Sequence, residues 1–246
     1  MKTILYLSPH LDDVVFSCSG HLRSEMEKGN KTIVATIFTK GDHDHRKEED
    51  KNALTLCGAE YIWLDKLDAP FRNQYYNSFE RLIFGNTKNE SIDLEPLIRK
   101  IQPDQVIAPL AVGTHIDHRI VFDACKKLTD VDLLFYADRP YSLIKGATEL
   151  RLHTLGYQTS LIPFEQFWDN YLEAKYVKTY LKKDLESVKE RLKKMYSKPQ
   201  QQLNYQIVSK KLPYAEAILS YHSQRDAFIS EEIFNTPETL FRLTTT

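Results

Sequence analysis

Two segments of this 246-residue chain share one design: a short apolar strand, then a polar loop with histidine and aspartate, then an amphipathic helix. The first strand is expected over residues 3–7 and the second over residues 105–110. Alternation of strands and helices favours a parallel sheet with helices on both faces. Open α/β sheets place their active sites beyond the carboxyl ends of the strands, so the two polar loops are the first candidates for chemistry.

The first polar loop holds a histidine and two adjacent carboxylates. Residues 8–13 read Ser-Pro-His-Leu-Asp-Asp directly after the apolar run. In a bend between strand and helix, His10 and Asp13 can converge on one metal ion while Asp12 points elsewhere and is free to handle a proton. The alternative is that the Asp-Asp pair only caps the next helix, since carboxylates are favoured at helix N-termini. On its own, this motif leaves both interpretations open.

The second polar loop favours the metal-site interpretation. It carries His115, Asp117 and His118, and two histidines three residues apart lie on one face of a helical turn. The apolar stripe of the helix explains its aliphatic residues but not the histidines. That stripe is Ile116, Ile120, Val121, Ala124 and Leu128. A single histidine is more often structural, whereas two that flank an aspartate at the end of a strand indicate a metal-assisted hydrolase.

Both motifs resemble the signature motifs of the LmbE-like, or PIG-L, family of zinc-dependent N-deacetylases. The matching residues are His10-Leu11-Asp12-Asp13, with Gly20 downstream, and His115-Ile116-Asp117-His118. Weaker matches extend the resemblance to about Gln224. They are Thr39-Lys40-Gly41, Arg46-Lys47-Glu48-Glu49, Cys57-Gly58-Ala59, Asp138-Arg139-Pro140-Tyr141 and Tyr221-His222-Ser223-Gln224. The commonest family form has proline at the Leu11 position and glutamate at the Val14 position, a departure that affects substrate choice rather than the metal ligands.

The resemblance implies a role for each residue of the two motifs. The zinc ligands are His10, Asp13 and His118. Asp12 is the general base that takes a proton from the attacking water. His115 stabilises the tetrahedral intermediate or protonates the leaving amine, and Asp117 orients His115 or one of the ligands. A catalytic zinc site typically has three protein ligands plus water, and another divalent ion such as Fe²⁺ can occupy a site of this kind.

The rest of the chain fits one α/β domain over residues 1–246, with a Rossmann-like, mostly parallel sheet and a helical C-terminal part from about residue 165. Further strands are expected at 31–38, 61–64 and 131–137, with 161–163 a weaker candidate. Helices are expected at 15–26, 48–57, 94–101, 116–128, 165–195 in one or two pieces, and 215–227. These assignments follow from hydrophobic periodicity and from Gly and Pro positions.

Composition and charge exclude several function classes. A formal net charge of −1 and a pI near 6.7 give no field to attract nucleic acid or an anionic membrane. No apolar stretch approaches the roughly 18 residues of a membrane span, and the start of the chain leaves no room for a removable signal peptide, so cytoplasmic residence is expected. The scattered Cys18, Cys57 and Cys125 predict buried thiols rather than disulfides.

Charged residues near the expected cleft are candidates for substrate binding. Arg46, Asp65 and Asp68 are the candidates for holding substrate hydroxyls. The loop 41–46 is dense in histidine and aspartate, but the metal shell is already filled, so a polar rim is the expected role for this loop.

Two arginines and two aromatic clusters leave alternatives open. Arg72 and Arg139 either bind a phosphate or carboxylate or form surface ion pairs. The aromatic clusters at 71–76 and 164–171 are expected mainly in the core, with sugar stacking as the alternative.

The leading hypothesis is a zinc-dependent deacetylase of an N-acetylated amino sugar or of a small-molecule conjugate that contains one. A second hypothesis is hydrolysis of another acyl amide or an ester, because such a site does not itself select the acyl group. A third is a sugar-binding protein with an inactive site, which the presence of every ligand and acid–base position disfavours. A phosphoesterase would need more carboxylates for a two-metal clamp. The sequence specifies neither the sugar nor the oligomeric state.

Overall fold

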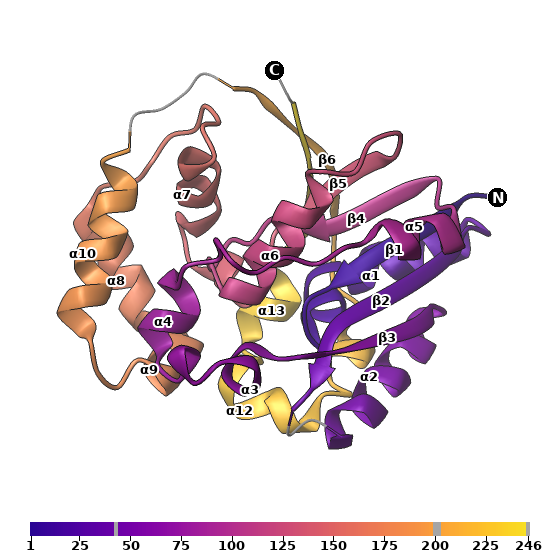
Figure 1. The fold of residues 1–246 in the computed structure, drawn as a ribbon, viewed down its shortest axis with the longest axis horizontal. Helices are drawn as coiled ribbons and strands as arrows, with labels where there is room; N and C mark the ends of the chain where they lie inside the picture. The colour runs from indigo at the N-terminus through magenta and orange to yellow at the C-terminus, as the bar shows by residue number, and fades with distance from the viewer. Residues whose placement is uncertain (42–43, 199–202, 245–246) are drawn as a thin grey trace.

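The computed structural model describes residues 1–41, 44–198 and 203–244. Within these residues lies one seven-stranded sheet in the order β3-β2-β1-β4-β5-β7-β6 (Figure 1). The strands are β1 (Thr3–Ser8), β2 (Lys31–Lys40), β3 (Glu60–Leu67), β4 (Gln105–Pro109), β5 (Asp132–Tyr136), β6 (Tyr205–Lys211) and β7 (Glu238–Leu243). Strands β1 to β5 are parallel, and β7 is antiparallel to both β5 and β6. The expected mostly parallel α/β fold is confirmed.

Side chains of the parallel strands belong to two separate hydrophobic clusters, one on each face of the sheet. On β1, Leu5 and Leu7 belong to one cluster, whereas Ile4 and Tyr6 belong to the other. Helix α6 (Ile116–Cys125) contributes to the first cluster. The second cluster includes residues of α1 (Asp13–Glu27), α2 (Asp44–Cys57) and α11 (Ala215–Ile218). Because successive side chains alternate between faces, strands that are apolar throughout need cover on both sides.

The far edge of the sheet differs from the sequence expectation. Strands β6 and β7 were not predicted, and residues 161–163 form no strand. Every residue of β6 is exposed or only partly buried, so this strand lacks the alternation of buried and exposed residues that marks a half-buried strand. Strand β7 is fixed by a long-range contact: Glu238 accepts hydrogen bonds from the Ser19 hydroxyl (2.9 Å) and the Gly20 amide (3.0 Å) of α1.

The C-terminal helical part is more interrupted than the sequence predicts. Residues 165–195 form α8 (Phe164–Glu173), α9 (Lys175–Tyr180) and α10 (Leu185–Tyr196). Ala174 has an extended backbone between the first two, and Asp184 is left-handed, with φ of 66°, before the third. Residues 215–227 likewise divide into α11, η3 (His222–Gln224) and α12 (Arg225–Phe228). Short helices of this kind depend on tertiary packing rather than on local propensity.

Three short helical turns after β3 were also absent from the sequence expectation. They are α3 (Ala69–Arg72), η1 (Gln74–Tyr76) and α4 (Phe79–Phe84). Asp68, Asn73 and Ser78 cap them by accepting hydrogen bonds from backbone amides at their starts. Helix α4 contacts α9 and α10, and α8 contacts both α9 and α10, so these elements form one helical lobe next to the sheet (Figure 1). The remaining elements are α5 (Glu95–Ile101), η2 (Tyr141–Leu143), α7 (Ala147–Thr154) and α13 (Glu231–Asn235).

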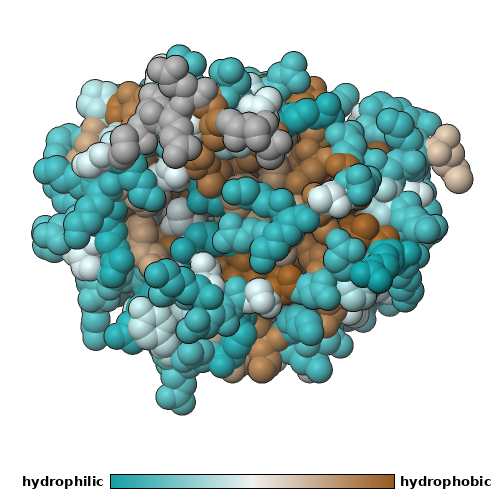
Figure 2. Space-filling view, turned by 45° about the horizontal axis from the view of Figure 1, so that its top comes forward, coloured by the Kyte–Doolittle hydropathy of each residue, from teal (hydrophilic) through white to brown (hydrophobic). Residues whose placement is uncertain are grey.

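The surface and the thiols agree with the compositional expectations. All three cysteines are buried and free, as predicted. Among the helices of the described residues, none combines the length and apolar character of a membrane span. The face drawn in Figure 2 is mainly hydrophilic, with hydrophobic side chains visible in the recesses between polar ones.

Candidate active site

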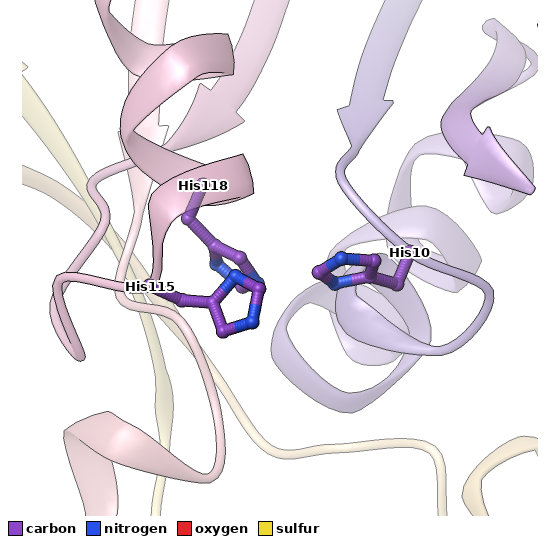
Figure 3. A group of neighbouring side chains, drawn as sticks. All are labelled: His10, His115 and His118. Carbon is purple, nitrogen blue, oxygen red and sulfur yellow. The ribbon is translucent and has the colours of Figure 1, made fainter. Parts of the chain in front are cut away.

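The two polar motifs meet because β1 and β4 are neighbouring parallel strands, with Ile4 paired opposite Gln105. Both strands end at the same edge of the sheet, so the loops that follow them face each other. His10 comes from the loop between β1 and α1, and His115 and His118 come from the start of α6 (Figure 3). The ring centroid of His10 lies 5.0 Å from that of His115 and 5.3 Å from that of His118.

The predicted ligands His10 and His118 each place a ring nitrogen close to Asp13, the third predicted ligand. Its Oδ2 lies 3.1 Å from His10 Nδ1 and 3.3 Å from His118 Nε2. Two donors that each stand about 2.0–2.1 Å from a tetrahedral ion are about 3.3 Å apart. The two distances to Asp13 are therefore those expected between neighbouring ligands of a zinc-like ion. A set of two imidazoles and one carboxylate also suits Fe²⁺.

Each of these two histidines is oriented by a carboxylate at its other ring nitrogen. His10 Nε2 lies 3.1 Å from Asp117 Oδ2, and His118 Nδ1 lies 2.6 Å from Asp138 Oδ1. Such partners fix the tautomer and the ring orientation of metal-binding histidines. The sequence analysis assigned no role to Asp138. Its position just beyond the carboxyl end of β5, next to β4 in the sheet, was the available signal.

Two groups of donors in the described residues lie within 4.8 Å of one another: His10 with His115 and His118, and His10 with Asp68 and Asp117; neither includes Asp13. The group with Asp117 is poorly suited to a metal, because Asp117 already accepts hydrogen bonds from Arg72 (2.6 Å) and from the Ala69 amide (3.1 Å). The group with His115 replaces a carboxylate by an imidazole. Metal content after substitution of His115 or of Asp13 distinguishes the set of His10, His115 and His118 from the predicted set of His10, Asp13 and His118.

Burial and mutual contacts set the charges of the cluster. Burial alone would raise the pKa of Asp13, but His118 and His10 hold that pKa well below its usual range. Burial alone would lower the pKa of His118, but Asp13 and Asp138 raise it to about 9. The pKa of His10 is likewise raised against burial by its carboxylate neighbours, Asp68 foremost. For His10 and His118, the effect of neighbouring carboxylates on the pKa exceeds that of burial, so these positions favour positive charge, which a metal ion would also supply.

Asp12 stands apart from the three donors and contacts Arg46. Its Oδ2 accepts a hydrogen bond from Arg46 Nη2 at 2.8 Å, and the same nitrogen donates to the Leu11 carbonyl at 3.0 Å. The φ of Asp12 is 149°, a costly value for a residue with a side chain and one typical of functional sites. Burial raises the pKa of Asp12 to about 7, although Arg46 opposes the shift. A carboxylate with this pKa is suited to take up and release a proton near neutrality.

His115 faces the same space as a neutral imidazole. It is the N-cap of α6, and its Nδ1 accepts a hydrogen bond from the Asp117 amide at 3.3 Å. With Nδ1 as the acceptor, the ring proton is on Nε2. Burial, followed by the positive charges of His10 and His118, lowers the pKa of His115 well below its usual range. His115 can therefore donate a hydrogen bond from Nε2 rather than carry a second proton.

Arg72 connects Asp117 to the wall of the site. Its Nη2 donates to Asp117 Oδ1 at 2.6 Å and its Nε donates to Glu90 at 2.5 Å, and Glu90 also accepts a hydrogen bond from the Tyr76 hydroxyl. Arg139 is buried and donates to the Ile233 carbonyl at 2.6 Å. Arg72 therefore forms ion pairs, as one alternative of the sequence analysis had it, although these are partly buried, whereas Arg139 donates to a backbone carbonyl.

A cavity of about 640 Å³ opens beside this cluster. The motif residues His10, Asp12, Asp13 and His115 line it, and so do two of the three predicted substrate-binding residues, Arg46 and Asp68. The cavity is therefore lined by residues of both motifs, whereas Asp117 and His118 are absent from its described lining.

The third predicted substrate-binding residue lies elsewhere. Asp65 is absent from the described lining of the cavity, and it accepts hydrogen bonds from Thr39 (2.8 Å) and Lys47 (3.0 Å). Of the predicted polar rim, His45 lines the cavity. Asp42 and His43 lie outside the described residues.

Comparison with known families decides the relationship that the motifs suggest. The model of the PIG-L family, described as GlcNAc-PI de-N-acetylase, matches residues 5–129, which include both polar motifs. The chain belongs to the PIG-L family.

Two curated relatives of this PIG-L chain are described as 2'-N-acetylparomamine deacetylases. The protein from Streptomyces fradiae is 31% identical over 183 residues, covering 65% of this chain and 64%, less than two thirds, of that enzyme. The protein from Niallia circulans is 26% identical over 186 residues, covering 57% of this chain and 68% of that enzyme.

Solved structures share the fold of this PIG-L chain over nearly its whole length. The zinc-inhibited form of teicoplanin deacetylase Orf2 matches with a TM-score of 0.60 and 16% identity, covering 98% of both chains. The A40926 pseudoaglycone deacetylase Dbv21 matches with a TM-score of 0.57 and 18% identity, covering 98% of this chain and 96% of that one. The fold therefore extends well beyond the segment that the PIG-L family model matches.

Proposed function

We propose that this protein is a metal-dependent N-deacetylase that removes the acetyl group from an N-acetylated amino sugar or from a conjugate that contains one. The observation that carries the proposal is the approach of His10 and His118 to Asp13 at 3.1 and 3.3 Å, beside Asp12 with its pKa of about 7. Family membership and the two relatives described as deacetylases of an N-acetylated amino sugar support the same reaction.

Zinc is the proposed ion, held by His10, Asp13 and His118, with Fe²⁺ as the alternative. The donor chemistry supports either metal. A protein of the same fold is described in a zinc-inhibited form, so the test below varies the amount of metal as well as its identity.

An amide needs an activated water, a stabilised carbonyl oxygen and a proton for the departing nitrogen. A bound divalent ion lowers the pKa of water and polarises a carbonyl. Asp12 takes the proton of the attacking water, since it is a buried carboxylate whose pKa of about 7 matches that task. The protonated Asp12 then carries the proton that the leaving amine requires.

The other residues of the cluster stabilise charge and orientation. The Nε2–H of His115 donates to the carbonyl oxygen as negative charge develops there. Asp117 holds the His10 ring through its Nε2, with Arg72 on the second carboxylate oxygen. The proposed role of His115 is therefore to stabilise the tetrahedral intermediate, the first of the two roles left open by the family resemblance.

Arg46 and Asp68 are the proposed contacts to substrate hydroxyls. Both line the cavity, and the Nε of Arg46 is buried without a hydrogen-bond partner among the described residues, so it can donate to a bound hydroxyl. Asp65 remains a prediction from the sequence, and its place outside the cavity lining gives it no support.

Release of acetate together with free amine tests the proposal. The metal-free protein, titrated with zinc or Fe²⁺ from below to above one equivalent, is incubated with N-acetylglucosamine and its methyl glycosides. We expect acetate and amine in equal amounts, lost on chelation and absent from Asp13→Ala. Hydrolysis of an ester or release of phosphate from a sugar phosphate, with no acetate from any acetamide, would refute the proposed function.

A further inference from the structure

We propose that Arg72 is a positioning residue for the metal site, because it holds Asp117 against the ring of His10. A second carboxylate near the same ring nitrogen, that of Asp68, is thereby left to bind the substrate. The inference rests on the proposed function and on its proposed ligand His10. It assigns a role to an arginine that lies outside both polar motifs.

Two carboxylates lie close to one nitrogen of His10. The Nε2 atom is 3.1 Å from Asp117 Oδ2 and 3.4 Å from Asp68 Oδ1. An imidazole nitrogen carries one hydrogen, so one of the two carboxylates is its main acceptor. Asp68 lines the cavity, whereas the side chain of Asp117 is 0% exposed. A ring orientation that depended on Asp68 would change whenever that carboxylate bound a substrate hydroxyl.

Arg72 fixes which of the two carboxylates binds His10. Its Nη2 donates to Asp117 Oδ1 at 2.6 Å, a short hydrogen bond between opposite charges. The other oxygen, Oδ2, accepts from the Ala69 amide at 3.1 Å and faces His10. If the carboxylate turned away from His10, both of these bonds would break. Asp117 therefore remains the acceptor of the His10 ring.

The position of Arg72 is itself determined by contacts from several segments. Its Nε donates to Glu90 at 2.5 Å, its Nη1 donates to the Leu67 carbonyl at 2.7 Å, and Glu90 also accepts from the Tyr76 hydroxyl. The guanidinium carbon lies 5.0 Å from the ring centroid of Phe38 and 5.9 Å from that of Tyr76. A planar fork of donors matches this set of acceptors and ring faces, whereas the compact ammonium of a lysine does not.

The expected effect on the metal acts through the tautomer of His10. With the hydrogen on Nε2 and donated to Asp117, the Nδ1 atom keeps a free lone pair. This Nδ1 is the atom that lies 3.1 Å from Asp13 Oδ2, the neighbouring proposed ligand. A carboxylate at the other ring nitrogen also raises the basicity of a ligating imidazole. Arg72 thus preorganises one ligand from outside the ligand set.

The sign of the effect separates positioning from charge. Removal of a positive side chain beside a cation site would strengthen metal binding by charge alone. Loss of positioning would weaken it, typically by about tenfold to a hundredfold for the partner of a ligating histidine. Because Arg72 acts through Asp117, we expect the lower end of that range.

Metal affinity tests the inference, measured as competition for zinc between the initially metal-free protein and a chromophoric chelator. We expect Arg72→Ala to bind zinc about tenfold more weakly than the parent. Arg72→Lys keeps the charge but not the fork, so it should be weakened as well. Arg99→Ala, which removes an exposed arginine of α5 from its ion pair with Glu95, is the control and should match the parent. An affinity equal to or above that of the parent in either Arg72 variant would overturn the inference.

A double-mutant cycle shows whether Arg72 acts through Asp117. Asp117→Ala removes the carboxylate that Arg72 holds, so Arg72→Ala in that background should weaken zinc binding no further. Two losses that multiply would overturn the inference, because a separate structural role of Arg72 would have that result. Urea unfolding of the metal-free proteins identifies variants that do not fold. If Asp117→Ala is one of them, the absorption spectrum of Co²⁺-loaded Arg72→Lys replaces the cycle: a spectrum that differs from the parent's supports the inference, and an identical spectrum overturns it.

The position of Asp68 has a test of its own. If Asp68 replaces Asp117 as the partner of His10 only in the absence of Arg72, Asp68→Asn should weaken zinc binding about tenfold more in the Arg72→Ala background than in the parent. Comparison of the two backgrounds cancels the loss of charge that Asp68→Asn causes in both. Equal losses in the two backgrounds would overturn the claim that Arg72 fixes the partner of His10.

These affinities do not depend on turnover, so the inference and the proposed function can fail separately. Acetate release by the parent, together with parent-like zinc binding in Arg72→Ala, would overturn the role of Arg72 and leave the deacetylase in place. The expected zinc affinities, together with no acetate from any acetamide, would support the role of Arg72 and refute the deacetylase.

Discussion

Asp12 and Asp13 are neighbours in sequence but have opposite environments. Two imidazoles lower the pKa of Asp13 against the effect of burial, and its Oδ2 lies at the centre of the proposed ligand set. Burial raises the pKa of Asp12 to about 7 although Arg46 contacts it. Two carboxylates whose pKa values are driven apart by their surroundings are typical of sites that use one as ligand or nucleophile and the other as acid or base.

His115 should act as a hydrogen-bond donor, and a glutamine can imitate that role. His115→Ala is expected to keep the metal and lose about a hundredfold to a thousandfold in kcat, the usual cost of removing one oxyanion donor. His115→Gln should recover at least about tenfold of that loss, because its side-chain amide also donates. If glutamine is as inactive as alanine while fold and metal content are intact, proton transfer is the better role for His115.

Asp138 should influence metal binding without touching the metal. It contacts His118 Nδ1 at 2.6 Å, and loss of such a partner typically costs about tenfold to a hundredfold in metal affinity. We expect Asp138→Asn to weaken metal binding by that factor in competition with a chromophoric chelator. Asp132→Asn, at an exposed position at the start of β5, serves as the control. Unchanged affinity in Asp138→Asn would make Asp138 a purely structural residue.

Helix α2 joins the active site to two other elements through its buried side. Arg46 reaches Asp12, and one turn later Asp50 accepts hydrogen bonds from Trp63 Nε1 of β3 (2.9 Å) and from the Tyr221 hydroxyl (2.7 Å). The weak family match around Tyr221 therefore corresponds to a contact that positions the helix of Arg46. Loss of the Asp50 contacts is therefore expected to displace Arg46, which lines the cavity.

The pH dependence of stability should report on Asp50. Burial raises its pKa from 3.8 to about 6, so its contribution to stability is present below about pH 4 and is lost as the pH rises through about 6. Asp50→Asn stays neutral, and its amide can donate to the Tyr221 oxygen while its carbonyl accepts from Trp63. Relative to the parent, the variant should gain up to about 3 kcal/mol in unfolding free energy between pH 4 and pH 7.

Urea unfolding at a series of pH values measures this difference. Glu48→Gln, on the exposed side of α2, is the matched control and should run parallel to the parent. A constant difference between Asp50→Asn and the parent across this pH range would show that Asp50 titrates as it does in the unfolded chain.

The elements that the sequence predicts are those with a strong local pattern. Strands β1, β2 and β4 are buried nearly end to end, and the aliphatic stripe of α6 has helical spacing, so periodicity identified them. Strand β6 and the short turns of the helical lobe carry no such pattern, because their positions depend on contacts distant in sequence. The contact of Glu238 with Ser19 joins residues 219 positions apart, which no local rule detects.

At the scale of the whole molecule, the motif residues and other residues that surround the cavity come from different parts of the chain. The motif residues lie within 5–129, the segment that the family model matches. Asp138 lies beyond it, and so do Tyr180 and Phe228, which line the cavity. The sequence could therefore predict the reaction class from its motifs, whereas the residues that support the ligands and shape the substrate side required the three-dimensional structure.

Metal content and turnover of Asp12→Asn and Asp13→Asn, measured on the same preparations, test the central claim most directly. The account predicts that Asp12→Asn keeps about one equivalent of metal and loses about a hundredfold or more in kcat, the scale of a removed proton transfer. Asp13→Asn should lose metal and turnover together. Metal loss from Asp12→Asn with full metal in Asp13→Asn would contradict the assignment of ligand and base.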